Sequence, residues 1–339
     1  MNKLLYPLSF IYEALSKADK ALKKPQKFSK PVISVGNLTW GGTGKTPIVI
    51  ELAKFIIAEG KKPVILTRGY GRKSKNPILL KDGGAGIDIK ESGDEAMLIA
   101  KSVPQADIII GSNRYENALK FQGETQADIY ILDDGFQHWK IKRDLDIVCI
   151  NAANPFGNGL LIPAGILRER IFALKRADLI IITNADMASP QQLENIKQKI
   201  NPFYKKEFII SQYGGYEIKK LNLIDNFDIQ TLKSCPIYAL SAIGFAEGFQ
   251  NSLKKAGIEI KNSFKLKDHH SYSLKNLQDI YKQIEKAAIL MITAKDAVKI
   301  AQIADEQIQA QIAVLTVKAD FQTGRQIWQT KISNILASF

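Results

Sequence analysis

Apolar residues along the chain fall into two alternating patterns. Short runs rich in Ile, Val and Leu predict strands, and between several of them apolar residues recur at helical spacing. The first series of expected strands covers residues 32–35, 63–67, 107–110, 129–132, 147–150 and 179–183. Helices are expected over residues 47–59, 95–101 and 114–121. This order predicts a parallel sheet covered by helices.

The later part of the chain repeats this organisation on a smaller scale. After about residue 212 the segment "QYGGYEIKKL" interrupts the first series, and further strands are expected over residues 237–240, 288–293 and 313–317. We therefore predict an α/β fold with two units. Residues 31–212 form the first, and residues 213–339 form a smaller one, joined near Gly214 and Gly215.

Residues 1–30 form a segment of a different kind. They hold seven lysines against Glu13 and Asp19, and their apolar residues mark one face of an expected helix. That face consists of Leu4, Leu8, Ile11, Tyr12 and Leu15, widened by Leu5 and Phe10. Polar positions from residue 9 to residue 19 exclude a signal peptide and a spanning helix. A helix in the interface of an anionic membrane and a helix docked on its own domain both remain open.

The net charge narrows the class of partner. The 339 residues carry a formal charge of +13, which favours nucleic acid, anionic lipid or a phosphorylated substrate. Because the sequence offers no recognisable aromatic platform for stacking bases, we expect no nucleic-acid partner. Cys149 and Cys235 stand in separate apolar stretches and indicate neither a metal site nor a disulfide, which fits a reducing compartment.

The stretch "TWGGTGKTP" resembles the phosphate-binding loop G-x-x-x-x-G-K-[ST], with a threonine in place of the first glycine. The loop consists of Thr39, Trp40, Gly41, Gly42, Thr43, Gly44, Lys45 and Thr46. An expected strand precedes it and an expected helix follows, so its N–H groups and the helix N-terminus can hold phosphate oxygens. Lys45 can bridge the outer phosphates, and the Thr46 hydroxyl can ligate Mg²⁺. The β-branch of Thr39 predicts ordinary backbone dihedrals at that position.

A nucleotide site also needs an acidic residue for its metal. Asp133 and Asp134 end the apolar run of residues 129–132. A solvated turn would explain them poorly, because Phe136 and Trp139 would then be exposed as well. We expect one carboxylate to ligate Mg²⁺ directly and the other to act through water or from behind the first.

Candidates for a general base are less distinct. Asp94 in "SGDEAML" opens an expected helix, where Ser92 or Asp94 can equally serve as an N-cap. "KDHH" holds Asp268, His269 and His270, and a histidine near a carboxylate can orient or tune that carboxylate. A solvent-exposed loop explains the same residues.

Several motifs taken in order carry a family resemblance. They are "VGNLTWGGTGKTP", "LTRGYGR", "SGDEAML", "DDGFQH", "LIPAGILRE", "SAIG", "DHH" and "ITAKDAVK". Together they resemble tetraacyldisaccharide 4′-kinase, the lipid A kinase of Gram-negative bacteria, from the N-terminus to about residue 300. The family often has proline where Arg170 stands here, which concerns the local turn.

The resemblance implies a P-loop kinase that transfers the ATP γ-phosphate to the 4′-hydroxyl of a tetraacyl glucosamine disaccharide 1-phosphate. Residues 39–46 would hold ATP, and Asp94 would be the base, tuned by His269 from the second unit. The other implied nucleotide-binding residues are Tyr70, Gln137, His138 and Arg168, and the implied metal-site residues are Thr46, Asp133, Asp134 and Glu169.

The implied substrate is a membrane lipid, which favours the membrane interpretation of residues 1–30. The resemblance thus implies a protein bound peripherally or shallowly inserted at the cytoplasmic face of the inner membrane. The sequence does not specify an oligomeric state, and a monomer is favoured.

A P-loop GTPase of the switch or metallochaperone type is the alternative. "ITNAD", from Thr183 to Asp186, approximates the guanine-reading [NT]-K-x-D, with Asn184 in place of the lysine that would stack on the base. A preference for GTP over ATP would favour this alternative, and lipid-dependent turnover would exclude it.

Overall fold

The computed structural model describes residues 5–70, 72, 74–244, 246–268 and 270–338. Within these residues twelve strands form one sheet, in the order β10-β9-β11-β12-β8-β7-β6-β1-β5-β2-β4-β3. Neighbouring strands are parallel except for β3 against β4 and β8 against β12. The predicted α/β class, a mostly parallel sheet covered by helices, is confirmed.

Every strand expected from the sequence is present. The strands are β1 (Val32–Asn37), β2 (Pro63–Thr67), β3 (Ile78–Leu80), β4 (Asp107–Ile110), β5 (Ile129–Asp133), β6 (Leu145–Asn151), β7 (Leu179–Thr183), β8 (Ile209–Lys219), β9 (Ile237–Ser241), β10 (Asn262–Lys265), β11 (Ile289–Thr293) and β12 (Ile312–Thr323). Of these, β3, β8 and β10 had no counterpart among the expected strands, and β12 runs six residues beyond its expected end at residue 317.

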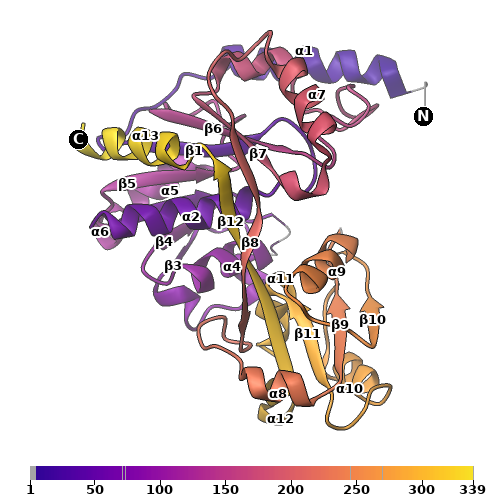
Figure 1. The fold of residues 1–339 in the computed structure, drawn as a ribbon. Coiled ribbons are helices and arrows are strands. Elements are labelled where there is room, and N and C mark those ends of the chain that lie inside the picture. Colours follow the sequence, from indigo (N-terminus) through magenta and orange to yellow (C-terminus); the bar gives the residue numbers. More distant parts are fainter. Residues whose placement is uncertain (1–4, 71, 73, 245, 269, 339) are drawn as a thin grey trace.

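The helices cover both faces of the sheet (Figure 1). They are α1 (Tyr6–Leu22), α2 (Lys45–Ala58), α3 (Ile89–Ser92), α4 (Asp94–Ser102), α5 (Arg114–Lys120), α6 (Gln122–Thr125), α7 (Pro190–Ile200), α8 (Ile229–Ser234), α9 (Ala246–Lys255), α10 (Leu274–Tyr281), α11 (Ala294–Ile300), α12 (Glu306–Ala310) and α13 (Arg325–Ala337). No helix in the described ranges is both long and apolar enough to cross a bilayer.

Figure 1 shows two lobes connected by the long strands β8 and β12. The first lobe comprises β1 to β7 with their helices, and the second comprises β9 to β11 with α8 to α12. The predicted boundary after residue 212 falls within β8, and α13 returns from the second lobe to the first.

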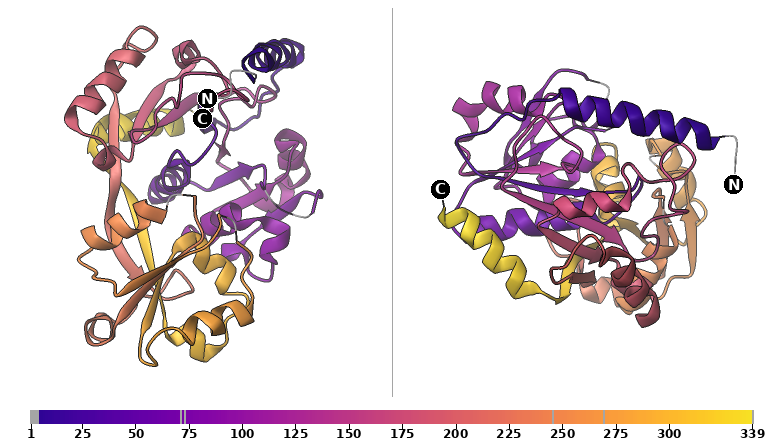
Figure 2. Two further views of the ribbon diagram at one scale, coloured as in Figure 1. Left: turned by 90° about the vertical axis from the view of Figure 1, so that its right-hand side faces the viewer. Right: turned by 90° about the horizontal axis from the view of Figure 1, so that it is seen from above.

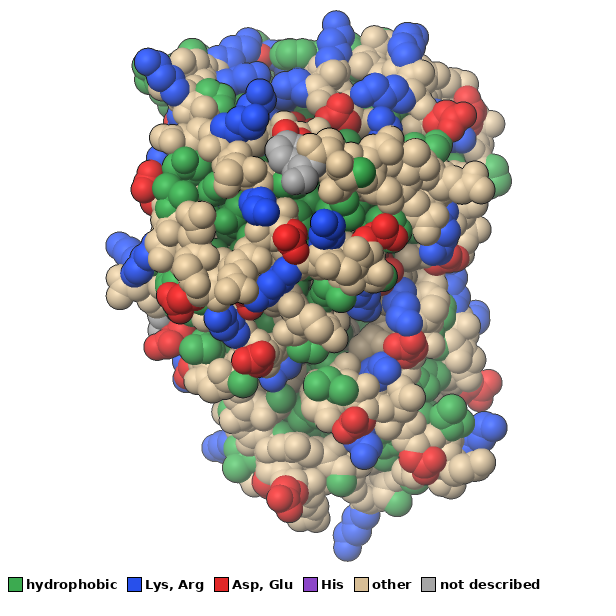
Figure 3. Space-filling view, turned by 90° about the vertical axis from the view of Figure 1, so that its left-hand side faces the viewer, with side chains coloured by type: hydrophobic (Ala, Val, Ile, Leu, Met, Phe, Trp, Pro, Cys, Tyr) green, Lys and Arg blue, Asp and Glu red, His purple; other side chains and the backbone are tan. Residues whose placement is uncertain are grey.

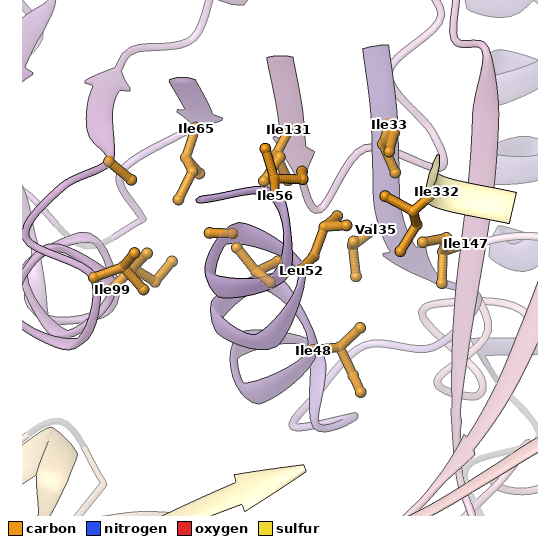
Figure 4. Close-up of a cluster of buried hydrophobic side chains, with 14 of the residues drawn as sticks. Ile33, Val35, Ile48, Leu52, Ile56, Ile65, Ile99, Ile131, Ile147 and Ile332 are labelled. Atoms are coloured by element: carbon orange, nitrogen blue, oxygen red, sulfur yellow. The ribbon is translucent and has the colours of Figure 1, made fainter. Parts of the chain in front are cut away.

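The core of the first lobe forms where α2 packs on β1 and its neighbours. Figure 4 shows Ile48, Leu52 and Ile56 of α2 facing strand side chains such as Ile33, together with Ile332 of α13. All five side chains are fully buried. Because α2 starts at Lys45, this packing fixes the end of the phosphate-binding loop that runs into the N-terminus of α2.

Helix α1 lies along the surface of the first lobe (Figures 1 and 2), and its polar side makes the contacts to that lobe. The Ser9 hydroxyl is buried and donates a hydrogen bond to the Leu161 carbonyl at 2.8 Å. Tyr12 donates to the Arg168 carbonyl at 3.1 Å, and Arg170 forms a two-pronged ion pair with Glu13, with N–O distances of 2.8 and 2.6 Å. The pair holds the pKa of Glu13 at about 2, against the opposing effect of burial.

The opposite side of α1 is apolar and exposed. Its large side chains are between 46% and 83% exposed, and they are Tyr6, Leu8, Phe10, Ile11, Leu15 and Leu22. Lysine and arginine side chains gather at the end of the molecule that carries α1 (Figure 3). The expected apolar stripe is therefore real among the described residues, with Tyr12 turned to the protein; Leu4 lies outside them.

Candidate active site

A cleft of about 1730 Å³ opens at the carboxyl ends of the parallel strands and is lined from both lobes. The phosphate-binding loop and the Asp133–Asp134 pair line it from the first lobe, and Asp268 and Lys295 line it from the second. Ligands of open α/β sheets bind at this end of the strands. The cleft is therefore the candidate active site.

The phosphate-binding loop connects β1 to α2, as predicted. Its glycines Gly41 and Gly44 have φ values of 113° and 70°, which side chains with a Cβ rarely adopt. Thr39 is buried and is not among the residues with positive φ, so the prediction of ordinary dihedrals at this position is confirmed. The Asn37 amide closes the loop by donating to the Thr39 carbonyl and the Thr43 hydroxyl, both at 2.8 Å.

Two carboxylates stand beside this loop because β5 is the neighbour of β1. Asp133 is 7% exposed and accepts a hydrogen bond from the Thr67 hydroxyl at 2.9 Å. Asp134 accepts from Arg168 Nη1 at 2.7 Å and lies 3.4 Å from Lys45 Nζ. The following Phe136 is fully buried, so these aspartates do not belong to a solvated turn.

The two carboxylates have opposite pKa shifts. Burial, and then the charge of Asp134, raise the pKa of Asp133. Burial acts in the same direction on Asp134, but Lys45 and Arg168 outweigh it and lower the pKa of Asp134 well below its ordinary range. Asp134 thus stays ionised beside Lys45 and Arg168, and the carboxyl group of Asp133 would lose its proton more readily if a further cation were bound.

The loop after β6 carries Arg168 and Glu169 to this region. Arg168 lines the cleft. Glu169 is paired with Arg176 at 3.0 and 3.1 Å and accepts a hydrogen bond from Gln137 at 3.0 Å. Gln137 lines the cleft, whereas Glu169 and His138 are not among the residues that line it. Tyr70 lines it with its side chain 67% exposed.

Asp94 lies at the first position of α4. The N-cap position is Gly93, with a φ of 85°, but Asp94 Oδ1 accepts a hydrogen bond from the Glu95 N–H at 3.0 Å, so Asp94 satisfies one of the free N–H groups of the first turn, as the sequence allowed. Its Oδ2 lies 3.7 Å from Lys295 Nζ. The side chain is 11% exposed, and the neighbouring Glu95, not Asp94, is among the residues lining the cleft. His269 lies outside the described residues.

Sequence reasoning missed several cationic groups of the cleft, among them Arg114 and Lys295. Arg114 is 5% exposed, donates to the Asp134 carbonyl at 3.4 Å, and lines the cleft at the start of α5. A cation at a helix N-terminus opposes the helix dipole, which was a usable signal. Lys295 is the first lysine of the motif "ITAKDAVK" and lines the cleft from the second lobe.

The guanine-reading interpretation of "ITNAD" finds no support in these contacts. Asp186 forms an ion pair with Lys255 of α9, and the Thr183 hydroxyl donates to the Thr43 carbonyl at 2.8 Å. Asn184 donates to Asn151 Oδ1 at 3.1 Å. In this structure Thr183 therefore holds the phosphate-binding loop, and Asp186 connects the first lobe to α9 of the second.

A phosphate-binding loop after β1, with paired carboxylates at the end of the adjacent β5, defines a P-loop nucleotide-dependent enzyme. Residues 1–337 match the family model described as Tetraacyldisaccharide-1-P 4'-kinase. The chain therefore belongs to the tetraacyldisaccharide 4′-kinase family, which confirms the resemblance and disfavours the GTPase alternative.

Individual relatives agree with this assignment. The tetraacyldisaccharide 4′-kinase of Syntrophus aciditrophicus is 38% identical over 306 residues, which cover 84% of this chain and 79% of the relative. That of Halothermothrix orenii is 36% identical over 314 residues, covering 88% and 78%. The crystal structure of LpxK from Aquifex aeolicus in complex with ATP is similar over 98% of each chain, with a TM-score of 0.76 and 29% identity.

Proposed function

We propose that this kinase transfers the γ-phosphate of ATP to the 4′-hydroxyl of a tetraacyl glucosamine disaccharide 1-phosphate, with Asp94 as the base. The observation that carries the assignment of residues is the cleft itself. Lys45 and Asp134 meet in its first-lobe wall at 3.4 Å, and the Asp94–Lys295 pair at 3.7 Å brings α4 to the second lobe.

ATP would lie with its phosphates on residues 39–46. Lys45 and Arg168 would compensate the charge of the outer phosphates, and the N-terminus of α2 adds a favourable potential. Tyr70 and Gln137 would border the nucleotide, since both line the cleft. His138 and Glu169 do not line the cleft, but they adjoin Gln137 and Arg168 in sequence and would stabilise these residues. Glu169 accepts a hydrogen bond from Gln137.

The donor set beside the loop suits magnesium. Asp133, Asp134 and the Thr46 hydroxyl are hard oxygen ligands, and the described residues hold no cluster of three or more His, Cys, Asp or Glu side chains that would form an all-protein cage. Mg²⁺ is usually held in this way, by one or two carboxylates, water and substrate phosphates. When bound, Mg²⁺ would neutralise charge on the transferring phosphoryl group.

Asp94 would accept or align the proton of the attacking hydroxyl, and His269 would tune it. Replacing Asp94 with Asn should abolish transfer and leave ATP binding nearly intact, because the amide keeps the shape but cannot accept the proton. Glu91→Gln is the matched control, since Glu91 is an exposed carboxylate on the preceding helix α3.

The assay is transfer of label from γ-labelled ATP, and in parallel GTP, to a detergent-solubilised tetraacyl disaccharide 1-phosphate with Mg²⁺. Labelled lipid from ATP is the expected result. Slow hydrolysis of GTP without labelled lipid would contradict the proposal, and normal turnover of Asp94→Asn would remove Asp94 from the mechanism.

Helix α1 would bring the cleft to the membrane, at its cytoplasmic face. Its polar side is occupied by contacts to the first lobe, and its apolar side is exposed next to a basic surface, as in helices that lie in a bilayer interface. Replacing Leu8, Ile11 and Leu15 with Gln should weaken binding to anionic vesicles without unfolding the protein, since all three are exposed. Unchanged vesicle binding would leave α1 as a structural element only.

A further inference from the structure

The motif "ITAKDAVK" places a lysine of the second lobe against the first-lobe helix that carries Asp94. Lys295 is the second residue of α11, and its Nζ lies 3.7 Å from Asp94 Oδ2 and 3.8 Å from Glu95 Oε1. The Glu95 side chain is 51% exposed, whereas the Asp94 side chain is 11% exposed. Because solvent screens the Lys295–Glu95 contact more than the Lys295–Asp94 contact, Asp94 is the stronger electrostatic partner.

The start of α11 is held by a buried carboxylate. Asp296, next to Lys295, is fully buried and accepts hydrogen bonds from the Thr293 hydroxyl at 2.7 Å and the Ala242 N–H at 3.1 Å. Its other oxygen lies 3.4 Å from Lys299 Nζ, and Lys299 in turn donates to the His270 carbonyl at 3.4 Å. Asp296 thus connects α11 to the "SAIG" loop and to the "DHH" loop.

The far end of α11 is also connected to the first lobe. Gln302 lies just beyond the helix, and its amide donates to the Ile87 carbonyl while its oxygen accepts from the Ile89 N–H, both at 3.3 Å. Ile89 begins α3, which directly precedes α4. Contacts at both ends of α11 therefore fix its position relative to the helix that begins with Asp94.

We propose that Lys295 is a positioning residue for the kinase reaction, which orients the Asp94 carboxylate through its charge when the lobes are together. This inference rests on the proposed role of Asp94. Lys295 lines the cleft but comes from the second lobe, so the first lobe alone lacks the cation that faces Asp94. The orientation of the base, rather than the binding of ATP, is the property that depends on this lysine.

The test compares Lys295→Met, Lys295→Gln and Lys295→Arg with wild type, measuring kcat and the KM for ATP in the lipid transfer assay. The neutral variants should lower kcat about tenfold to hundredfold with little change in KM, as expected for a displaced catalytic group. Arg should restore a substantial part of kcat, because it keeps the charge. Lys286→Met is the control, since Lys286 is an exposed lysine of the same lobe that does not line the cleft.

Three results would overturn the inference. Unchanged kcat in the neutral variants would show that the charge is not needed, and a loss confined to the KM for ATP would make Lys295 a nucleotide contact. An Arg variant as slow as the Met variant would point to shape instead of charge. Asp94→Asn, assayed alongside, distinguishes the two proposals. Normal turnover of Asp94→Asn would refute the role of Asp94 as the base. An inactive Asp94→Asn variant together with a fully active Lys295→Met variant would refute only the positioning role of Lys295.

Discussion

His138 provides a prediction whose size follows directly from the structure. Burial, and then the charges of Arg114 and Arg143, lower the pKa of His138 from 6.5 to about 3. The unfolded chain therefore binds a proton at this position at a higher pH than the folded protein does. Acid consequently favours the unfolded state between pH 6.5 and pH 3, and stability is lost as the pH falls through that window.

The shift sets the magnitude. A difference of about 3.5 pKa units corresponds to about 5 kcal/mol once the pH is below both values. At pH 5, where the folded imidazole is still neutral, the loss relative to pH 8 amounts to about 2 kcal/mol. Replacing His138 with Gln or Asn removes this contribution, because neither side chain titrates.

The measurement is the free energy of unfolding from urea titrations at pH 8 and pH 5. Each His138 variant should lose about 2 kcal/mol less than wild type on acidification. The carboxylates with raised pKa values, such as Asp133 and Asp146, are present in all three proteins, so their effects cancel in the comparison. Equal losses in wild type and both variants would refute the argument, as would an NMR titration showing His138 protonated in the folded protein at pH 5.

Three further predictions concern the fold around the site. Gly36→Ala places a Cβ 2.5 Å from Phe136 Cβ and 2.6 Å from its backbone nitrogen, so urea titration should show a loss of about 1–3 kcal/mol, and an unchanged midpoint would contradict this close packing. Asp296→Ala leaves Lys299 without its buried partner and should cost about 3–5 kcal/mol in the same experiment; a loss below about 1 kcal/mol would contradict it. Arg170→Ala removes the exposed part of the α1 attachment, so stability should fall by less than about 1 kcal/mol. Limited proteolysis within α1 should nevertheless become faster, and an unchanged cleavage rate would show that Ser9 and Tyr12 suffice.

Buried parallel strands were predictable because both of their faces are apolar, so runs such as residues 147–150 have no competing interpretation. Strand β8 was missed for a physical reason. A Cβ on Gly214 would stand 2.7 Å from Asp320 Cβ on β12, and the pairing shifts register nearby, between Thr316 and Lys318. The glycines that look like a break in the sequence thus permit close approach within a long antiparallel pair.

The local parts of the site were predictable for a similar reason. The phosphate-binding loop and the Asp133–Asp134 pair are each contiguous in sequence, and the strand before each one fixes its position. Lys295 pairs with Asp94, which lies about two hundred residues earlier in the sequence. Arg176 pairs with Glu169 through a local fold of the chain that no sequence pattern predicts. The first pair depends on how the lobes pack and the second on how the loop after β6 folds, and hydrophobic periodicity describes neither.

Helix α1 shows the same distinction between a pattern and its environment. The sequence indicated an apolar face but could not indicate which face is docked, so both interpretations stayed open. In the structure the docked side contains Ser9, Tyr12 and Glu13, each with a specific polar partner. A helix held only for stability would turn its apolar side inward, because burial of apolar surface supplies most of the favourable free energy. The exposed apolar face of a helix that is anchored by polar contacts therefore supports the proposal that α1 lies in a bilayer interface, where the lipid substrate would be found.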